Sequence, residues 1–168
     1  MVSESQSFSL PRNVPLPRVT FRRPTEIDAA VVWVLIAKCP RLDRNSLYRE
    51  LLLCTDFADI CVLAERAGVI GWMSAYRRPR EPSSVFIWQI AVHPKIRNTG
   101  VGRGLIISAL NRPSCENVTH IKATVALSNR ASKLLFASAA RSLHAPIRQA
   151  LCFDRESILR DSMRASTR

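Results

Sequence analysis

The sequence predicts a single α/β domain built around a mixed β-sheet. Its 168 residues, 47% of them hydrophobic, suffice for one buried core but are too few for two ordinary domains. Segments with period-two and helical apolar patterns follow one another in the order β, α, α, β, β, β, α, β, α, β, which is typical of a mixed sheet flanked by helices. The apolar run at 85–92 has the composition of a central strand that is buried on both faces.

The first 17 residues differ in composition from the rest of the chain. They are rich in Ser, carry three Pro residues and lack apolar periodicity, so burial does not offset the entropy lost on ordering them. We interpret 1–17 as a disordered N-terminal tail and 18–168 as the folded domain. The chain has no uninterrupted apolar window of about 18 residues and no signal-peptide pattern at its start. We therefore expect a cytoplasmic protein that does not enter a membrane.

Two helices are expected near the start of the domain. Thr25, with Asp28 three residues on, favours the start of the first helix, and Pro40 is expected to end it. Asn45 or Ser46 is expected to cap the second helix. The apolar side chains predicted to face the core are Ile27, Ala30, Val31, Val34 and Leu35 of the first helix and Leu47, Leu51 and Leu52 of the second.

Strands are expected before these helices and through the middle of the chain. A strand at 19–22 precedes the helices, and strands at 60–65 and 69–77 are expected to form a hairpin around Gly68, since glycine suits a tight turn. A basic loop at 78–84 leads into the apolar strand. The remaining elements are predicted at 102–110 (helix), near Pro113 (turn), at 121–126 (strand), at 130–143 (helix) and at 147–153 (strand).

The composition argues against several other functions. The net charge of +12 comes from 21 Arg and four Lys spread along the chain, with one dense run at 77–80 and no interleaved aromatic side chains to stack on bases. A generally basic surface is therefore favoured over nucleic-acid binding. The five cysteines have neither CxxC nor Cys/His spacing, so we expect no disulfide framework and no metal site. They are Cys39, Cys54, Cys61, Cys115 and Cys152.

A glycine-containing segment between the apolar strand and the next helix has the pattern of a phosphate-binding loop. Gly100, Gly102 and Gly104 allow the backbone to turn tightly and to approach a ligand closely. The N–H groups at the start of the helix and the positive end of its dipole favour a pyrophosphate, to which Arg97 or Arg103 adds charge. An ordinary strand-to-helix turn is the alternative that glycines alone do not exclude.

This segment resembles the acetyl-CoA motif of the GNAT superfamily of acetyltransferases. Arg97, Gly100 and Gly102 meet the signature (Gln/Arg)-x-x-Gly-x-(Gly/Ala), directly after the strand end Ala91-Val92-His93-Pro94. The resemblance implies a central, mixed, mostly antiparallel twisted sheet flanked by helices, with acetyl-CoA as cosubstrate and no metal. The residues that it assigns to acetyl-CoA are Val92, Arg97, Asn98, Thr99, Gly100, Val101, Gly102, Arg103, Asn129 and Ser132.

Longer strings resemble the diaminobutyrate acetyltransferases within that superfamily. The resemblance implies direct acetyl transfer, in a ternary complex, to the terminal amine of L-2,4-diaminobutyrate, giving N-γ-acetyl-2,4-diaminobutyrate. This is the step before ring closure in ectoine synthesis. The strings are Phe21-Arg22-Arg23-Pro24, Leu42-Asp43-x-Asn45-Ser46-x-Tyr48, Leu51-Leu52-Leu53-Cys54-Thr55, Ala64-Glu65 and Trp88-Gln89-Ile90-Ala91-Val92-His93-Pro94.

The same resemblance assigns roles at the reacting centre. The amide of Val92 is expected to donate to the ligand beside the open sheet edge. Asp43, Glu65 or a water chain is expected to accept the ammonium proton. Turn capping by Asp43 and plain core packing by Trp88 are the structural alternatives. The side chains assigned to the diamine, which needs an acid and an aromatic wall, are Asp43, Tyr48, Trp88 and Gln89.

Three features depart from the usual pattern. Phe136 stands where many GNAT enzymes have a tyrosine general acid, so solvent or another residue must protonate the leaving thiolate. Asn98 and Thr99 replace the commoner Gly-Gln, and Asn tolerates a left-handed backbone better than most residues. The chain at 154–160 lacks the closing strand of the family, and homodimer pairing is expected to cover the sheet edge. Two alternatives stay open: acetylation of another small amine, and a catalytically weakened CoA-binding or basic interaction protein.

Overall fold

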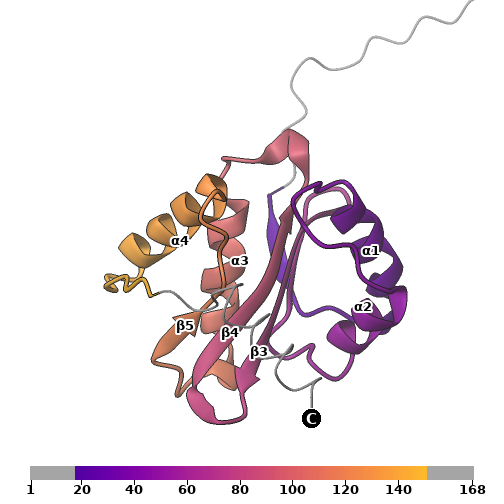
Figure 1. Ribbon diagram of the computed structural model, residues 1–168. Coiled ribbons are helices and arrows are strands. Elements are labelled where there is room, and N and C mark those ends of the chain that lie inside the picture. Colours follow the sequence, from indigo (N-terminus) through magenta and orange to yellow (C-terminus); the bar gives the residue numbers. More distant parts are fainter. Residues whose placement is uncertain (1–17, 151–168) are drawn as a thin grey trace, which may run out of the picture.

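The computed structural model describes residues 18–150, which form one five-stranded sheet with helices on both faces (Figure 1). The strands are β1 (Thr20–Arg22), β2 (Val62–Glu65), β3 (Val69–Arg78), β4 (Glu81–Val92) and β5 (His120–Lys122), and the helices are α1 (Ala29–Ala37), α2 (Leu47–Cys54), α3 (Val101–Leu110) and α4 (Arg130–Ser142). The sheet order is β1-β2-β3-β4-β5, antiparallel throughout except for the parallel pair β4 and β5. The mixed, mostly antiparallel sheet expected from the sequence is confirmed.

The two faces of the sheet carry separate cores. One core joins α1 and α2 to side chains such as Leu63, Trp72 and Ala91. The other joins α3 and α4 to the opposite face, where Met73 and Ile87 lie. The apolar strand β4 therefore contributes to both cores, as its sequence predicts. Over residues 18–150 no helix combines the length and apolar character needed to cross a bilayer.

Two hairpins build the centre of the sheet. The β2–β3 turn contains Ala67 and Gly68, both with positive φ (53° and 121°), and the hairpin predicted there is confirmed. The β3–β4 hairpin closes more tightly than predicted, because Arg78 already pairs with Glu81. The prediction of a loop at 78–84 is therefore wrong. Glu81 extends the strand, since its carboxylate pairs with Lys122 of β5 (2.6 Å) as well as with Arg78.

Helix α1 buries a different side from the one predicted. Ile27, in the turn before it, is 83% exposed, and Ala30, Val31 and Val34 are exposed as well, while Leu35 is buried as expected. All nine residues of α1 are apolar, so the spacing of apolar residues cannot identify the face that meets the sheet. The buried residues of the helix are Ala29, Val32, Leu35 and Ile36.

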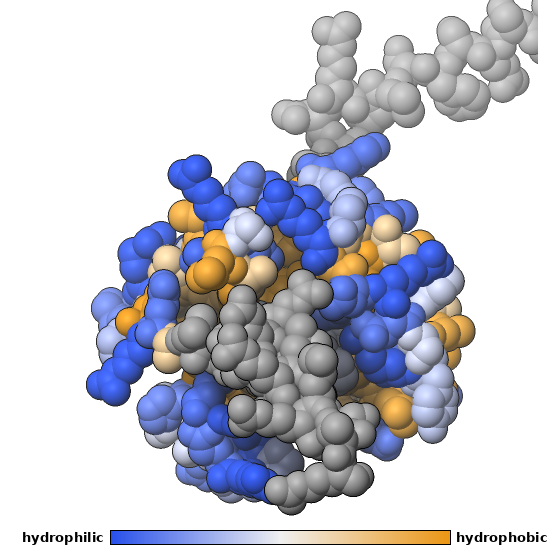
Figure 2. Space-filling model, viewed as in Figure 1, coloured by the Kyte–Doolittle hydropathy of each residue, from blue (hydrophilic) through white to orange (hydrophobic). Residues whose placement is uncertain are grey.

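Helix α2 also turns differently from the prediction. Leu47 and Leu51 are exposed and Leu52 is half-buried. The buried positions are Glu50, Leu53 and Cys54. The charged residue Glu50 thus lies on the inward face of α2. An assignment based on hydrophobicity places it on the outer face. Figure 2 shows a mostly hydrophilic surface with apolar residues scattered over both sides of the view, some of them where α1 and α2 lie.

The last predicted strands are shorter than expected or lie outside the described residues. Only two residues of the strand predicted at 121–126, Ile121 and Lys122, pair with β4, and β4 bulges at Trp88 just beyond them. Residues 147–150 form no strand. The rest of the strand predicted at 147–153, the tail at 1–17 and the divergent segment at 154–160 fall outside the described residues.

Candidate active site

The sheet opens along one edge of β4. β3 pairs with β4 as far as Val92, but β5 pairs only with Ser84–Phe86. The β5-facing backbone from Ile87 to Val92 therefore has no strand partner in the described part of the chain. The N–H of His93 donates to the carbonyl of Ile70 on β3 (2.9 Å). Because successive N–H groups of a strand point to opposite sides, the Val92 N–H faces the open edge, where it has no hydrogen-bond acceptor among the described residues.

The loop after β4 presents a row of unpaired backbone N–H groups. Asn98 has a φ of 65° and Gly100 a φ of 88°, so the left-handed backbone expected at Asn98 is confirmed. The first backbone hydrogen bond of α3 runs from the Gly104 N–H to the Gly100 carbonyl (2.9 Å). The N–H groups of 98–103 consequently have no acceptor among residues 18–150. At a helix start such groups form an anion-binding site.

Two guanidinium groups flank this loop. Arg97 is exposed, and its Nε donates to the Val92 carbonyl (3.4 Å). Arg103 is also exposed. Its Nη2 atom lies 3.7 Å from the position that a Cβ atom would occupy if Gly100 had a side chain. The Thr99 hydroxyl donates to a carbonyl of the one-turn helix before it (2.8 Å) and steadies the turn. Free N–H groups, a helix N-terminus and two guanidinium groups together suit a diphosphate.

Two of the loop glycines serve packing within the protein. A Cβ on Gly102 would lie 3.0 Å from Leu135 of α4, and a Cβ on Gly104 would lie 2.3 Å from the Phe21 ring. These glycines let α4 and β1 approach α3 closely, and Val101, directly before Gly102, is buried. A hollow of about 540 Å³ runs between β1 and α3 and reaches the loop. It is lined by Val19, Phe21, Thr99, Gly100, Val101, Arg103, Gly104, Ile107, Ser108 and Asn111.

The second predicted cofactor segment begins α4. Asn129 caps the helix, because its side-chain oxygen accepts from the Ser132 N–H (3.1 Å). Both predicted residues therefore sit at the helix start, on the same side of the sheet as α3. Phe136 packs against the α3-side core. It supplies no proton, which agrees with the departure noted in the sequence.

Where the chain enters α2, the structure brings the side chain of Gln89, the neighbour of Trp88 on β4, to the backbone of Asp43. The Gln89 side chain is buried and donates from Nε2 to the backbone carbonyl of Asp43 (3.0 Å). Trp88, at the bulge of β4, is 50% exposed. The Asp43 carboxylate belongs to an exposed residue. Tyr48 lies in the first turn of α2 and is 66% exposed, without a side-chain hydrogen bond to the other three.

Sequence reasoning missed Arg49 and Glu50, which lie beside these residues. Arg49 stacks over the Trp88 ring with Cζ at 5.0 Å from its centroid, and Nη2 donates to the Gln89 side chain (2.9 Å). Two adjacent charged residues at the start of a helix are typical of a solvated surface. The one available signal is that Glu50 shares a helical face with Leu53 and the residue after it.

Glu65, the other predicted proton acceptor, belongs to an ion-pair network on the far side of β3. Oε1 of Glu65 accepts a hydrogen bond from Nη2 of Arg22 (2.7 Å). The Arg22 guanidinium also donates to Asp28, once from Nη1 and once from Nη2, both at 2.7 Å. Hydrogen bonding from Arg22 lowers the pKa of Asp28 to about 2, and both carboxylates raise the pKa of Arg22. Glu65 lies on β2, which β3 separates from β4.

The cysteines behave as core side chains where the structure describes them. Burial raises the pKa of the Cys54 and Cys61 thiols to about 12 and raises that of Cys115. Thiols with such pKa values are not nucleophiles near neutral pH. Cys39 is buried as well, and Cys152 lies outside the described residues.

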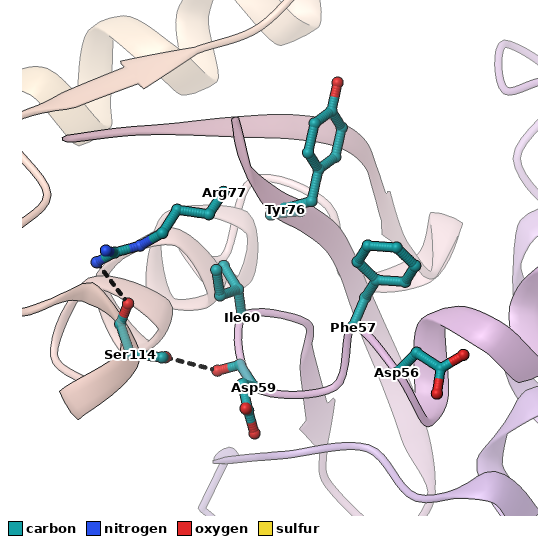
Figure 3. Close-up of a pocket in the computed structure, with 8 residues that line it drawn as sticks. Asp56, Phe57, Asp59, Ile60, Tyr76, Arg77 and Ser114 are labelled. Carbon is teal, nitrogen blue, oxygen red and sulfur yellow. Dashed lines mark hydrogen bonds between the residues drawn. The ribbon is translucent and has the colours of Figure 1, made fainter. Parts of the chain in front are cut away.

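A second hollow, of about 260 Å³, lies at the other end of β3, away from Val92 (Figure 3). In Figure 3 the Arg77 side chain reaches the Ser114 carbonyl (2.8 Å), and the Ser114 hydroxyl donates to the Asp59 carbonyl (3.0 Å). The Asp59 carboxylate is also paired, with Arg23 at 3.0 Å. No residue predicted for the site lines this hollow, whose polar groups serve to hold neighbouring segments together.

The chain is similar to known acetyltransferases in both sequence and structure. The sequence profile of the Acetyltransferase (GNAT) family matches residues 30–139. The L-2,4-diaminobutyric acid acetyltransferase of Bordetella parapertussis is 37% identical over 155 residues, which make up 91% of this chain and 83% of that protein. That of Virgibacillus pantothenticus is 40% identical over 121 residues, 71% of this chain and 76% of that one. A solved diaminobutyrate acetyltransferase from Paenibacillus lautus, in complex with L-2,4-diaminobutyric acid and coenzyme A, is 38% identical with a TM-score of 0.75, covering 77% of this chain and 79% of that chain.

Proposed function

This chain belongs to the GNAT family of acetyltransferases and, within it, to the L-2,4-diaminobutyric acid acetyltransferases, and we propose that it transfers the acetyl group of acetyl-CoA to the terminal amine of L-2,4-diaminobutyrate. The product is N-γ-acetyl-2,4-diaminobutyrate, the compound that precedes ring closure in ectoine synthesis. One observation carries the proposal: the open edge of β4 ends at the free Val92 N–H, directly before the unpaired N–H groups of 98–103. A thioester joined to a diphosphate by an extended arm matches this order of donors.

The donor side of the reaction is assigned to the backbone. The N–H groups of 98–103 and the charges of Arg97 and Arg103 hold the diphosphate. The arm then lies along β4 in place of a strand, and the Val92 N–H donates to the ligand at its reactive end. Because these donors are fixed before the substrate binds, they need no reorganisation during the reaction.

The acceptor side is assigned to the opposite wall of the open edge. Asp43 offers a carboxylate to an ammonium group, and the Trp88 ring offers an aromatic face beside it. Gln89 fixes the Asp43 turn through its backbone carbonyl, and Tyr48 adds a hydroxyl from α2. Binding of both substrates together, as this arrangement requires, gives direct transfer in a ternary complex.

The transfer removes two protons from the amine nitrogen, one from the ammonium before attack and one to solvent as the amide forms, and it supplies one proton to the leaving thiolate. We assign acceptance of the ammonium proton to Asp43 or to a water that it orders, in preference to Glu65, whose carboxylate Arg22 already holds. The neutral amine nitrogen then bonds to the thioester carbon, and the C–S bond breaks. Since Phe136 has no acidic proton, the leaving thiolate takes its proton from solvent.

We further propose that the protein is a cytoplasmic homodimer. The support is the row of exposed apolar side chains on the outer side of α1 and α2, which monomeric surfaces seldom gather in one place. They are Ile27, Val31, Val34, Leu47 and Leu51. Sedimentation equilibrium of the full chain tests this, and a purely monomeric protein at micromolar concentration would contradict it.

The function is tested by incubating the purified protein with acetyl-CoA and L-2,4-diaminobutyrate. We expect CoA release detected with a thiol reagent, and mass spectrometry with fragmentation should locate the acetyl group on the terminal nitrogen. A panel of shorter and longer diamines, run in parallel, separates diaminobutyrate from another small amine. Tight acetyl-CoA binding without CoA release for any amine would instead identify a weakened CoA-binding protein, and RNA binding stronger than acetyl-CoA binding would indicate a polyanion-binding role.

A further inference from the structure

A buried ion pair lies at the start of α2, next to the proposed acceptor site. The side chain of Glu50 is fully buried and that of Arg49 is 13% exposed. Arg49 Nε donates to Glu50 Oε1 (3.1 Å), and Nη2 of Arg49 donates to the same oxygen. The guanidinium is therefore held against its own helix by a carboxylate that water does not reach.

From this position Arg49 connects three segments of the site. Its Nη2 donates to Oε1 of Gln89 (2.9 Å), and its guanidinium covers the Trp88 ring at 5.0 Å. Gln89 passes the connection on, because its Nε2 donates to the Asp43 carbonyl (3.0 Å). The guanidinium of Arg49 thus contacts α2 and the bulge of β4 directly and reaches the Asp43 turn through Gln89.

Stability alone does not account for this pair. Oε2 of Glu50 and Nη1 of Arg49 are buried without a hydrogen-bond partner in the described part of the chain. Incompletely satisfied buried ion pairs generally contribute less to stability than apolar side chains of the same volume. The pair does hold the guanidinium in one orientation. A planar guanidinium held in this way fixes the position of its hydrogen-bond acceptor and the orientation of any ring stacked on it.

We propose that Arg49 is a positioning residue for the amine acceptor, setting the orientation of Trp88 and Gln89 with Glu50 as its buried counterion. The proposal rests on the proposed function, because it concerns the acceptor half of that reaction. Arg49 does not touch the acetyl-CoA loop, so its effect is confined to the amine. A lysine at this position keeps the positive charge but has neither the fork nor the flat surface that covers the ring.

The test compares Arg49→Lys with Arg44→Lys as a matched control. Arg44 also stacks on a tryptophan, Trp33, with Cζ at 3.9 Å from the ring centroid, but it has no hydrogen bond to Gln89. For Arg49→Lys we expect the KM for diaminobutyrate to rise by about tenfold, equivalent to about 1.4 kcal/mol, with the KM for acetyl-CoA within about twofold of wild type. Arg44→Lys should change neither KM by more than about twofold.

Two further measurements separate positioning from general damage. The double variant Arg49→Lys/Trp88→Phe should raise the diamine KM by clearly less than the product of the two single effects, since both changes disturb one contact. In a Trp33→Phe background, acrylamide should quench the fluorescence of Trp88 more strongly once Arg49 is Lys. This readout follows Trp88 because Trp72 is fully buried.

The outcomes are distinct. Equal rises in both KM values, or independent effects in the double variant, would overturn the proposal and leave Arg49 a purely structural residue. Increased quenching with an unchanged diamine KM would overturn it as well, because the contact would then exist without consequence for the acceptor. If the wild-type protein acetylates no diaminobutyrate, the proposed function fails first, while the quenching experiment still reports whether Arg49 holds Trp88.

Discussion

The contact between α3 and β1 gives a prediction that distinguishes a packing glycine from a ligand-binding glycine. A Cβ on Gly104 would lie 2.3 Å from Cζ of Phe21 and 2.9 and 3.0 Å from its two Cε atoms. All three distances are shorter than any normal carbon–carbon contact, so the ring must move in Gly104→Ala. Phe21 pairs with Ala64 of β2 and packs against the α3-side core, and its displacement therefore disturbs the edge of the sheet.

The magnitude follows from two opposing effects. Replacing glycine by alanine inside a helix favours folding by about 1 kcal/mol. Overpacking a well-packed contact costs about 1–3 kcal/mol, and the rigid ring places Gly104→Ala in the upper part of that range. We expect a net loss of about 1–2 kcal/mol. For a chain of this length each kcal/mol lowers Tm by about 2–4 °C, so Tm should fall by about 2–8 °C.

Thermal unfolding followed by circular dichroism measures this loss, and calorimetric titration with CoA measures the ligand site. The Gly104 N–H is already bonded to the Gly100 carbonyl, so CoA affinity at a temperature well below Tm should stay within about twofold of wild type. The double variant Gly104→Ala/Phe21→Leu serves as the control and should recover part of the Tm. If Gly104→Ala melts at or above the wild-type temperature, the steric reasoning is refuted.

Three other predictions concern single charged residues. Because Arg22 holds the pKa of Asp28 at about 2, below its unfolded value near 4, the contribution of Asp28 to stability is present above about pH 4 and is lost as pH falls towards 2. Urea unfolding should show a loss of about 1–2 kcal/mol over that range, discounted for the partial exposure of Arg22, and a weaker dependence for Asp28→Asn. Asp43→Ala should raise the KM for diaminobutyrate several-fold more than the KM for acetyl-CoA, and equal rises would show a structural role. Arg97→Gln should raise the KM for acetyl-CoA by about three- to tenfold at low salt and less at high salt, whereas a salt-independent effect would argue against a charge contact with the diphosphate.

The features that the sequence predicted correctly are those decided by a few neighbouring residues. Asp28 accepts hydrogen bonds from the Thr25 N–H and hydroxyl (2.7 and 2.9 Å), and Ser46 caps α2 as one of the two expected candidates. Asn98 takes the left-handed backbone that its side chain tolerates. In each of these cases the interaction closes within about four residues, so the local sequence contains the whole cause.

The errors arise where partners distant in sequence decide the outcome. The sheet, and not the helix itself, selects which side of the wholly apolar α1 is buried. Glu50 is buried because Arg49 neutralises it and because Gln89, 39 positions after Glu50 in the printed sequence, completes the contact. The length of β5 depends on the bulge at Trp88, which removes the partner that the residues after Lys122 would need.

The candidate site divides in the same way. The proposed acetyl-CoA loop could be assigned from sequence because its turns and glycines follow one another in a short segment from Arg97 to Gly104. The proposed acceptor residues were assigned only through resemblance, since Asp43 and Trp88 come from segments that no local pattern connects. Arg49 had no signal of this kind, because its proposed role depends on contacts to Gln89 and Trp88 of β4.

The unpaired edge of β4 has a consequence for how such a protein can diversify. Main-chain N–H groups stay in place after nearly every side-chain substitution. Sequence drift therefore does not abolish recognition of the molecule that carries the acyl group. Under the proposed function, selection for a new amine acts on the other wall, to which Asp43 and Tyr48 are assigned. Recognition of the acyl carrier and selectivity for the amine are thereby assigned to the two sides of one opening in the sheet.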